Sequence, residues 1–103
     1  MDIIAKTILL QLGGNHFIVM TGSNNFVSLS HGLRMNLAMN KSSANRLSIT
    51  LDESKDTYVM HFYRQTMNKF GEIKMCDVAK YEDVYFDMLQ PLFTKVTGMY
   101  THL

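Results

Sequence analysis

The sequence predicts an α+β fold, in which an antiparallel β meander of about five to six strands carries a short N-terminal helix and a longer C-terminal helix on its apolar face. Two observations predict this arrangement. Short segments of alternating polar and apolar residues follow one another through the middle of the chain, separated by turn residues rather than by long crossovers. Apolar residues recur at helical spacing towards both ends of the chain.

The N-terminal helix is expected over residues 3–12, because Asp2 is a suitable N-cap and Gly13 follows the last apolar position. The apolar run after it predicts a strand, and Gly22 with its polar neighbours predicts a turn. The strands are expected at residues 16–20, 25–30, 33–40, 46–51, 57–65 and 72–76. Strict alternation places Met39, Tyr58, Met60, Phe62, Ile73 and Met75 among the inward-facing side chains.

The C-terminal helix is expected from about Val84 to Val96, with Asp83 as its N-cap or as an acid of its first turn and Gly98 just beyond its end. Pro91 lies inside this pattern. Proline lacks an N–H donor and crowds the carbonyl four residues earlier, so a kink or a break is expected near Asp87.

Length and composition describe one small domain. The chain has 103 residues, of which 47% are hydrophobic, and residues 1–103 are expected to form a single α+β domain around one core. The one cysteine, Cys76, excludes an internal disulfide and is typical of a cytoplasmic protein. The first residues lack the charged leader of a signal peptide, and their apolar run is too short to span a membrane.

The glycines of residues 13–22 raise the question of a phosphate-binding loop. Such a loop follows a strand, opens a helix and contains a lysine. Here Gly13 and Gly14 follow the predicted helix, and no lysine lies between Lys6 and Lys41. The favoured interpretation is therefore a helix end followed by a turn.

The residues that metals and catalysis need are scattered along the chain. The soft metal ligands are His16, His31, His61, His102 and Cys76, and none has the spacing of a metal site. Neither a nucleophile motif nor a paired acid and base is recognisable. The sequence predicts a protein that is not an enzyme and that uses no metal or cofactor.

The outward face of the predicted sheet favours nucleic-acid binding. Arg34, Arg46 and Lys74 are expected there as phosphate ligands, and Tyr63 as a side chain that stacks on a base. Residues 1–50 carry four basic groups and one acidic group, whereas residues 51–103 carry six basic and eight acidic groups. The alternative is an ordinary solvated face, because the open face of any half-covered sheet is polar.

A protein-interaction module, either an inhibitor of a host factor or a homodimer, is the second hypothesis. Val59, His61 and Tyr63 are expected to form an exposed apolar and aromatic strip, and such strips mark protein contacts. The tail after Gly98 contributes Met99, Tyr100 and Leu103. Of these, Tyr100 is expected to pack back on the last helical turn.

Several motifs carry a resemblance to known proteins. They are LGGN at residues 12–15, Phe17, MTG at 20–22, NF at 25–26, the segments 45–51 and 56–58, and the closing Val84, Tyr85, Phe93, Thr97, Gly98 and Leu103. Together they resemble a family of small uncharacterised proteins of bacteriophages and integrated mobile elements. The resemblance implies a protein of the bacterial cytoplasm that binds nucleic acid or a host protein, and it transfers no catalytic residue. Pro91 departs from the uninterrupted helix expected in that family.

Overall fold

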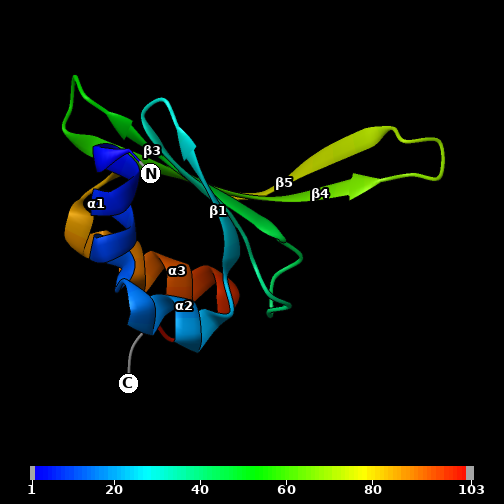
Figure 1. Cartoon of the computed structure of the whole chain (residues 1–103), viewed down its shortest axis with the longest axis horizontal. Coiled ribbons are helices and arrows are strands. Elements are labelled where there is room, and N and C mark those ends of the chain that lie inside the picture. The colour runs from blue at the N-terminus through cyan, green and yellow to red at the C-terminus, as the bar shows by residue number, and fades with distance from the viewer. Residues whose placement is uncertain (1, 102–103) are drawn as a thin grey trace.

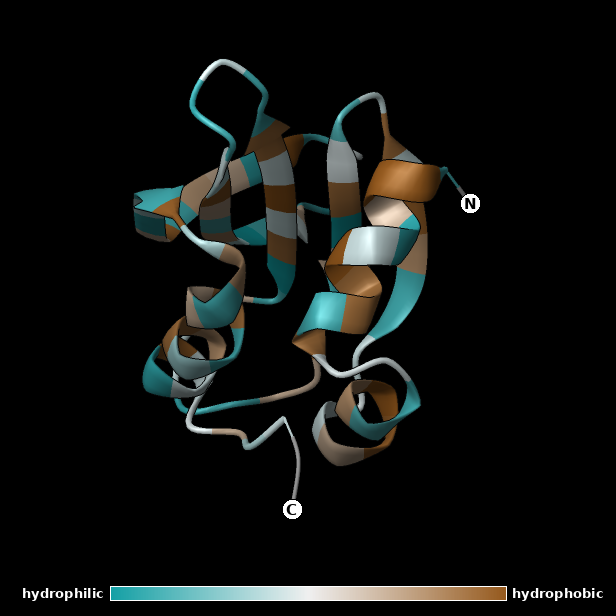
Figure 2. Cartoon of the chain, turned by 90° about the vertical axis from the view of Figure 1, so that its left-hand side faces the viewer, coloured by the Kyte–Doolittle hydropathy of each residue, from teal (hydrophilic) through white to brown (hydrophobic). Residues whose placement is uncertain are grey.

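The protein consists of a five-stranded antiparallel sheet with its helices packed on one face (Figure 1). The structure is a computed structural model that describes residues 2–101. The elements are α1 (Ile3–Leu12), α2 (Asn15–Thr21), β1 (Asn24–Leu29), β2 (Gly32–Asn36), β3 (Arg46–Asp52), β4 (Thr57–Met67), β5 (Ile73–Val84), a 3₁₀ turn (Phe86–Met88) and α3 (Leu89–Thr97). The strands lie in the order in which they occur in the chain, so the predicted meander is confirmed. Figure 2 shows hydrophobic and hydrophilic residues alternating along the strands.

The glycine pair separates two helices rather than a helix from a strand. Gly13 ends α1, where its N–H donates to the carbonyl of Leu10, and Gly14 precedes α2; both have positive φ. The strand expected at residues 16–20 is therefore wrong. An apolar run of five residues is compatible with the two-residue period of a strand and with the 3.6-residue period of a helix. Here the buried residues follow the helical period, since Phe17 and Thr21 are buried four residues apart.

The C-terminal half differs from expectation in where β5 ends. This strand continues to Val84, which pairs with Tyr58, so α3 begins at Leu89 rather than at Val84 and has nine residues. Pro91 is the third residue of α3, where its missing N–H has no carbonyl within the helix to bind. The break expected near Asp87 corresponds to the 3₁₀ turn that precedes α3.

The strand expected at residues 33–40 ends at Asn36, and the chain continues as a loop to Asn45. Leu37 remains buried, but the side chain of Met39 is 99% exposed instead of facing the core. The alternation therefore predicts the inward face of β2 correctly and fails where the segment leaves the sheet.

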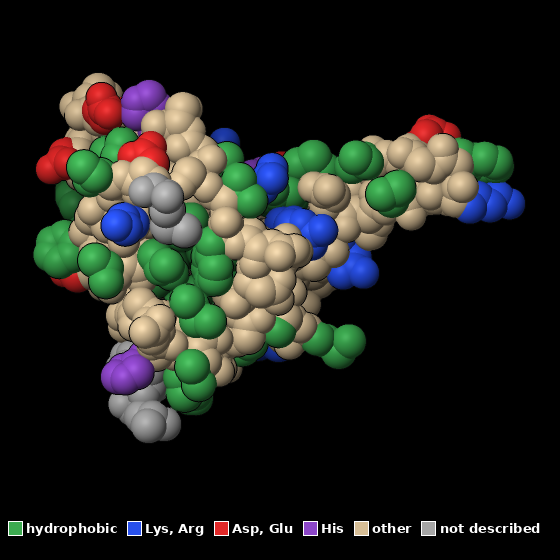
Figure 3. All heavy atoms as spheres, viewed as in Figure 1, with side chains coloured by type: hydrophobic (Ala, Val, Ile, Leu, Met, Phe, Trp, Pro, Cys, Tyr) green, Lys and Arg blue, Asp and Glu red, His purple; other side chains and the backbone are tan. Residues whose placement is uncertain are grey.

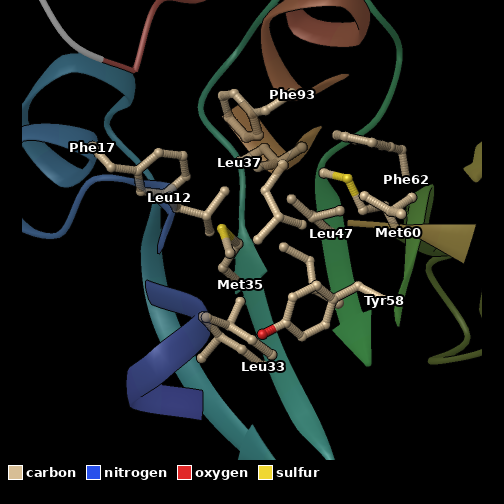
Figure 4. Packing of buried hydrophobic residues seen from close by; sticks show 14 of the residues in the cluster. Leu12, Phe17, Leu33, Met35, Leu37, Leu47, Tyr58, Met60, Phe62 and Phe93 are labelled. Atoms are coloured by element: carbon tan, nitrogen blue, oxygen red, sulfur yellow. The ribbon is translucent and has the colours of Figure 1, made fainter. Parts of the chain in front are cut away.

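The core lies between the sheet and the helices. Figure 4 shows Leu33, Met35, Leu47, Met60 and Phe62 of the strands meeting Leu12, Phe17 and Phe93 of the helices. The rings of Phe17 and Phe93 pack edge to face with their centroids 4.9 Å apart. This contact joins α2 to α3, which are far apart in the chain.

Strands β4 and β5 continue beyond the rest of the sheet as a two-stranded arm, defined as residues 64–76 (Figure 1). The last pair between β3 and β4 is Arg46 with Tyr63, whereas β4 and β5 stay paired as far as Met67 with Ile73. Residues beyond Tyr63 therefore belong to a ribbon of two strands that no third strand supports.

We predict that Phe17→Ala lowers the free energy of unfolding by about 3–5 kcal/mol, because it leaves a cavity against Phe93. Val19→Ala is the matched control, since Val19 is 82% exposed and its truncation should change stability by less than about 0.5 kcal/mol. Urea unfolding measures both. Equal losses for the two variants would contradict the helix, because only a strand places residues 17 and 19 on one face.

Tyr58 provides a second prediction. Its hydroxyl donates a 2.7 Å hydrogen bond to Oε1 of Gln11, and burial raises the pKa of this hydroxyl. Below about pH 10 the hydroxyl is protonated in both folded and unfolded chains. At higher pH the unfolded chain ionises first, so the stability contributed by Tyr58 is lost as the pH rises through the folded pKa.

Tyr58→Phe should therefore lower stability by about 0.5–1.5 kcal/mol at neutral pH and make the alkaline loss of stability shallower. Denaturant unfolding at neutral and at alkaline pH is the measurement. Tyr85→Phe is the control, because Tyr85 is 59% exposed. An alkaline profile that Tyr58→Phe leaves unaltered would contradict the assignment.

Candidate functional site

Strand register brings the polar side chains of the outer face, the sheet face away from the helices, into two rows. The first row is Arg34, Ser48, His61 and Lys80, and the second is Asn36, Arg46, Tyr63 and Asp77. Paired residues of neighbouring strands project from the same face of a sheet. Arg34 and Arg46 therefore belong to one surface, as the alternation predicts.

Both arginines line a groove of about 430 Å³ on this face, which we call the basic groove. Its lining residues are Asn25, Phe26, Val27, Arg34, Asn36, Arg46 and Gln65. A bulge between Asn24 and Val27 shifts the register of β1, and Asn25 there has a φ of 53°. Two guanidinium groups thus share a concave surface with amide side chains, and no carboxylate is among these lining residues.

The charges of the basic groove are uncompensated. The ion pairs found among residues 2–101 are His31–Glu53, Lys55–Asp83, His61–Asp77 and Lys80–Glu82. None of them involves Arg34 or Arg46, although Nη1 of Arg46 donates to the carbonyl of Asn45 at 3.0 Å. Guanidinium groups with free N–H donors are suited to bind oxyanions such as phosphates.

Charge is also segregated along the sheet. The end that carries the arm has Lys41, Arg46, Arg64, Lys69 and Lys74 against Glu72 and Asp77, and Asp77 is paired with His61; we call it the basic end. The opposite end has Asp52, Glu53, Asp56, Glu82 and Asp83 against Lys55. In Figure 3 lysine and arginine side chains lie along the arm and its base, and most acidic side chains lie at the other end.

Hydrogen bonds and ion pairs stabilise the charges of the acidic end. A hydrogen bond from the side chain of Ser54 to Asp52 (2.7 Å) lowers the pKa of that carboxyl group. The carboxylate of Asp83, 3.3 Å from the ammonium of Lys55, raises the pKa of the lysine. The acidic end therefore compensates part of its own charge, whereas the cations of the basic end form none of the ion pairs among the described residues.

Tyr63 does not have the exposure expected of a stacking residue. Only 4% of its surface is accessible, and its ring centroid lies 4.9 Å from that of His61. Tyr63 occupies the middle of the sheet, with Arg46 and Asp77 as its cross-strand partners, so neighbouring side chains surround its ring. The expectation that Tyr63 stacks on a base is therefore wrong.

Lys74 is exposed, but it lies on the other face of the arm from the one that continues the outer face. It pairs with Thr66, which shares a face with Phe62, whereas Ile73 pairs with Met67 on the face of Tyr63. A register shift between Phe62 and Tyr63 places each residue of β5 in the arm on the face opposite to the expected one. Ile73 and Met75, which the alternation places inward, are instead 61% and 57% exposed on the arm.

The strip proposed for a protein partner is not an exposed apolar surface. Val59 is half-buried, and Tyr63 is buried. Nε2 of His61 lies 2.6 Å from Oδ1 of Asp77, and only 26% of the histidine side chain is accessible. These three residues therefore offer a partner little apolar area.

The tail contributes to a different hollow, which sequence reasoning missed. A groove of about 790 Å³ lies between the end of α1 and the start of α3, lined by Gln11, Phe86, Asp87, Gln90, Pro91, Thr94, Tyr100 and Thr101. Met99 packs against the core, whereas Tyr100, expected to pack back on the last helical turn, is 70% exposed. His102 and Leu103 lie outside the described residues.

Asn45 fastens the base of the arm to the loop that follows β2. Its side-chain amide donates to the carbonyl of Gln65 (2.9 Å), and its side-chain oxygen accepts from the Gln65 N–H (2.8 Å). Nη1 of Arg64 donates to the carbonyl of Ser43 at 3.0 Å. The side chain of Asn45 thus takes the place of one further residue of β3 and holds Gln65 beside the basic groove.

Comparison of the chain with protein-family models, with curated proteins and with solved structures finds no match. The resemblance to small bacteriophage proteins stays a prediction. Within residues 2–101 no group of three His, Cys, Asp or Glu side chains is placed to hold a metal ion. No single described helix is long and apolar enough to cross a membrane, and α1 with α2 meets those criteria only as a pair bent by 62°.

We predict that Asn45→Ala lowers the free energy of unfolding by about 1–3 kcal/mol, because two hydrogen bonds to the backbone of Gln65 are lost. Amide hydrogen exchange should accelerate at Gln65 before it does in β3. Ser43→Ala is the control, since Arg64 contacts only the main-chain oxygen of Ser43. Unaltered exchange at Gln65 in Asn45→Ala would refute this role.

Proposed function

We propose that this protein binds nucleic acid, with the basic groove and the basic end of the sheet as its contact surface. The single observation that carries the proposal is the convergence of two uncompensated arginines, Arg34 and Arg46, on one polar groove. Phosphates are the ligands that such a surface attracts most strongly, because each contact joins a full charge to directional hydrogen bonds.

The residues have distinct roles in this proposal. Arg34 and Arg46 bind phosphates in the groove, while Asn25, Asn36 and Gln65 hydrogen-bond to phosphate or sugar oxygens. Lys74 binds the backbone from the arm, outside the groove. Tyr63 lies beside Arg46 on the outer face and does not contact a base, because its ring is buried.

The acidic end of the sheet orients the protein on its ligand. A polyanion repels that end and attracts the opposite one, so the arm and the groove approach first. The proposal involves no catalysis and no cofactor. In the setting that the resemblance implies, the ligand belongs to a bacteriophage or to its host, and the protein acts in the cytoplasm of the bacterial cell.

A protein partner is the second candidate, and the groove between α1 and α3 favours it. Phe86, Pro91 and Tyr100 line this groove, and Phe86 is 62% exposed. Leu10 of α1 is a further exposed apolar residue, at 73%. Apolar hollows on a small protein mark contacts with other proteins, so this groove replaces the strip of Val59, His61 and Tyr63 as the place for a host factor or a second copy.

Fluorescence anisotropy with labelled DNA and RNA across a range of salt concentrations tests the proposal. The logarithm of the binding constant should fall linearly with the logarithm of salt concentration. Arg34→Ala with Arg46→Ala should make that slope shallower by about 2 and weaken binding to all sequences alike. The charge-matched control is Lys6→Ala with Lys95→Ala, because both lysines are exposed on helices that cover the other face.

Two results would refute the proposed function. One is the absence of binding at low salt. The other is binding whose affinity does not depend on salt or on the two arginines. Thermal unfolding of each variant verifies that the protein remains folded, as expected for side chains on the solvent side of the sheet.

A further inference from the structure

The arm has two chemically different faces and an aromatic tip. Met67, Ile73 and Met75 project from one face and are 68%, 61% and 57% exposed, and Phe70 at the tip is 76% exposed. Arg64, Thr66 and Lys74 project from the opposite face. The arm therefore exposes apolar side chains that the core does not use, beside cations that form none of the ion pairs among the described residues.

The tip is held in one conformation by its own hydrogen bonds. Oδ1 of Asn68 accepts from the N–H groups of Phe70 (2.9 Å) and Glu72 (3.0 Å), and the N–H of Gly71 donates to the carbonyl of Asn68. Gly71 has a φ of 81°, which suits glycine. The turn thus presents the ring of Phe70 to the outside, with Nζ of Lys69 5.2 Å from its centroid.

Charge determines which partner covers this arm. Residues 64–76 hold Arg64, Lys69 and Lys74 against Glu72. Two arms of this composition repel each other, so a second copy of the chain is disfavoured as the occupant, whereas a polyanion is attracted. The face with Met67 and Ile73 also continues into the outer face that holds the basic groove. One ligand can therefore contact the groove and the arm together.

The dimensions of the arm fit double-helical DNA. Four residues of each strand extend beyond the sheet, which gives a ribbon about 13 Å long. A two-stranded ribbon fits the major groove of B-form DNA, which is about 8.5 Å deep, whereas the major groove of an RNA duplex is too narrow. A single ring at a narrow tip acts as a wedge between stacked base pairs, since a platform for successive unpaired bases needs several rings.

We propose that the arm enters the major groove of duplex DNA and that Phe70 inserts between adjacent base pairs, unstacking them and bending the duplex, while Arg34 and Arg46 hold the phosphates beside that groove of the DNA. This inference rests on the proposed nucleic-acid function and adds the form of the ligand and the residue that reaches its bases. Met67 and Ile73 pack against the displaced bases, and Lys69 binds the phosphate next to the opened step.

The test combines affinity with a direct report on base stacking. Duplex DNA carries 2-aminopurine at scattered positions and a fluorescence donor and acceptor at its two ends. Wild-type protein should raise 2-aminopurine fluorescence and shorten the end-to-end distance. Phe70→Ala should abolish both signals and weaken duplex binding about tenfold, the size expected for loss of one stacking contact, without altering the salt slope.

Tyr85→Ala is the matched control, because Tyr85 is also an exposed ring (59%) and lies between β5 and the 3₁₀ turn, away from the arm. It should bend DNA as the wild type does. Thermal unfolding should be the same for both variants, since neither ring belongs to the core.

The outcomes separate the inference from the function on which it rests. If Phe70→Ala binds and bends duplex DNA like the wild type, the wedge is wrong and the nucleic-acid function stands. If single-stranded DNA or duplex RNA binds more tightly than duplex DNA, the wedge is also wrong. Self-association that Phe70→Ala abolishes, without an effect on DNA, would assign the arm to a second copy. If the wild type binds no nucleic acid at low salt, both proposals fail.

Discussion

The length of β4 relative to β3 is the constraint on which this structure depends. Along residues 58–63 β4 is flanked on both sides, and Tyr58, Met60 and Phe62 complete the core there. Beyond Tyr63 the same strand has only β5 as a neighbour and becomes one side of the arm. A single strand therefore connects the packed interior to the part of the molecule that extends furthest from it, and the arm is oriented by the core.

Asn45 makes this change from sheet to ribbon gradual. Its side chain supplies one more pair of hydrogen bonds to β4 after the backbone of β3 has turned away. Gln65, whose backbone forms both of these hydrogen bonds, lines the basic groove together with Arg34 and Arg46. The geometry of the groove and the direction of the arm thus depend on the same residue, so a ligand that contacts both meets a surface whose parts do not move independently.

Alternation predicts most of the sheet because one face of each strand is buried. Leu47 and Ile49, like Met60 and Phe62, could face the core only in a strand, and Arg34 and Arg46 follow on the other face. Periodicity cannot decide residues 16–20, where every position but one is apolar. It also cannot reveal the bulge after Phe62 that exchanges the faces of β5, or the neighbours that bury Tyr63. The apolar and basic composition of residues 64–76 does indicate the surface of the arm, but only once β4 is known to extend beyond β3.

The contact between Phe17 and Phe93 has a consequence for how the protein folds during its synthesis. The strands are neighbours in the chain and can pair as soon as they leave the ribosome, but the ring that packs against Phe17 is made more than seventy residues later. Until α3 has emerged, the surfaces of Phe17 and Phe62 that pack against Phe93 stay uncovered. The nascent chain therefore passes through a stage in which part of its core is exposed and prone to aggregate. Once α3 is complete, this surface is buried and chaperones have no exposed core to bind.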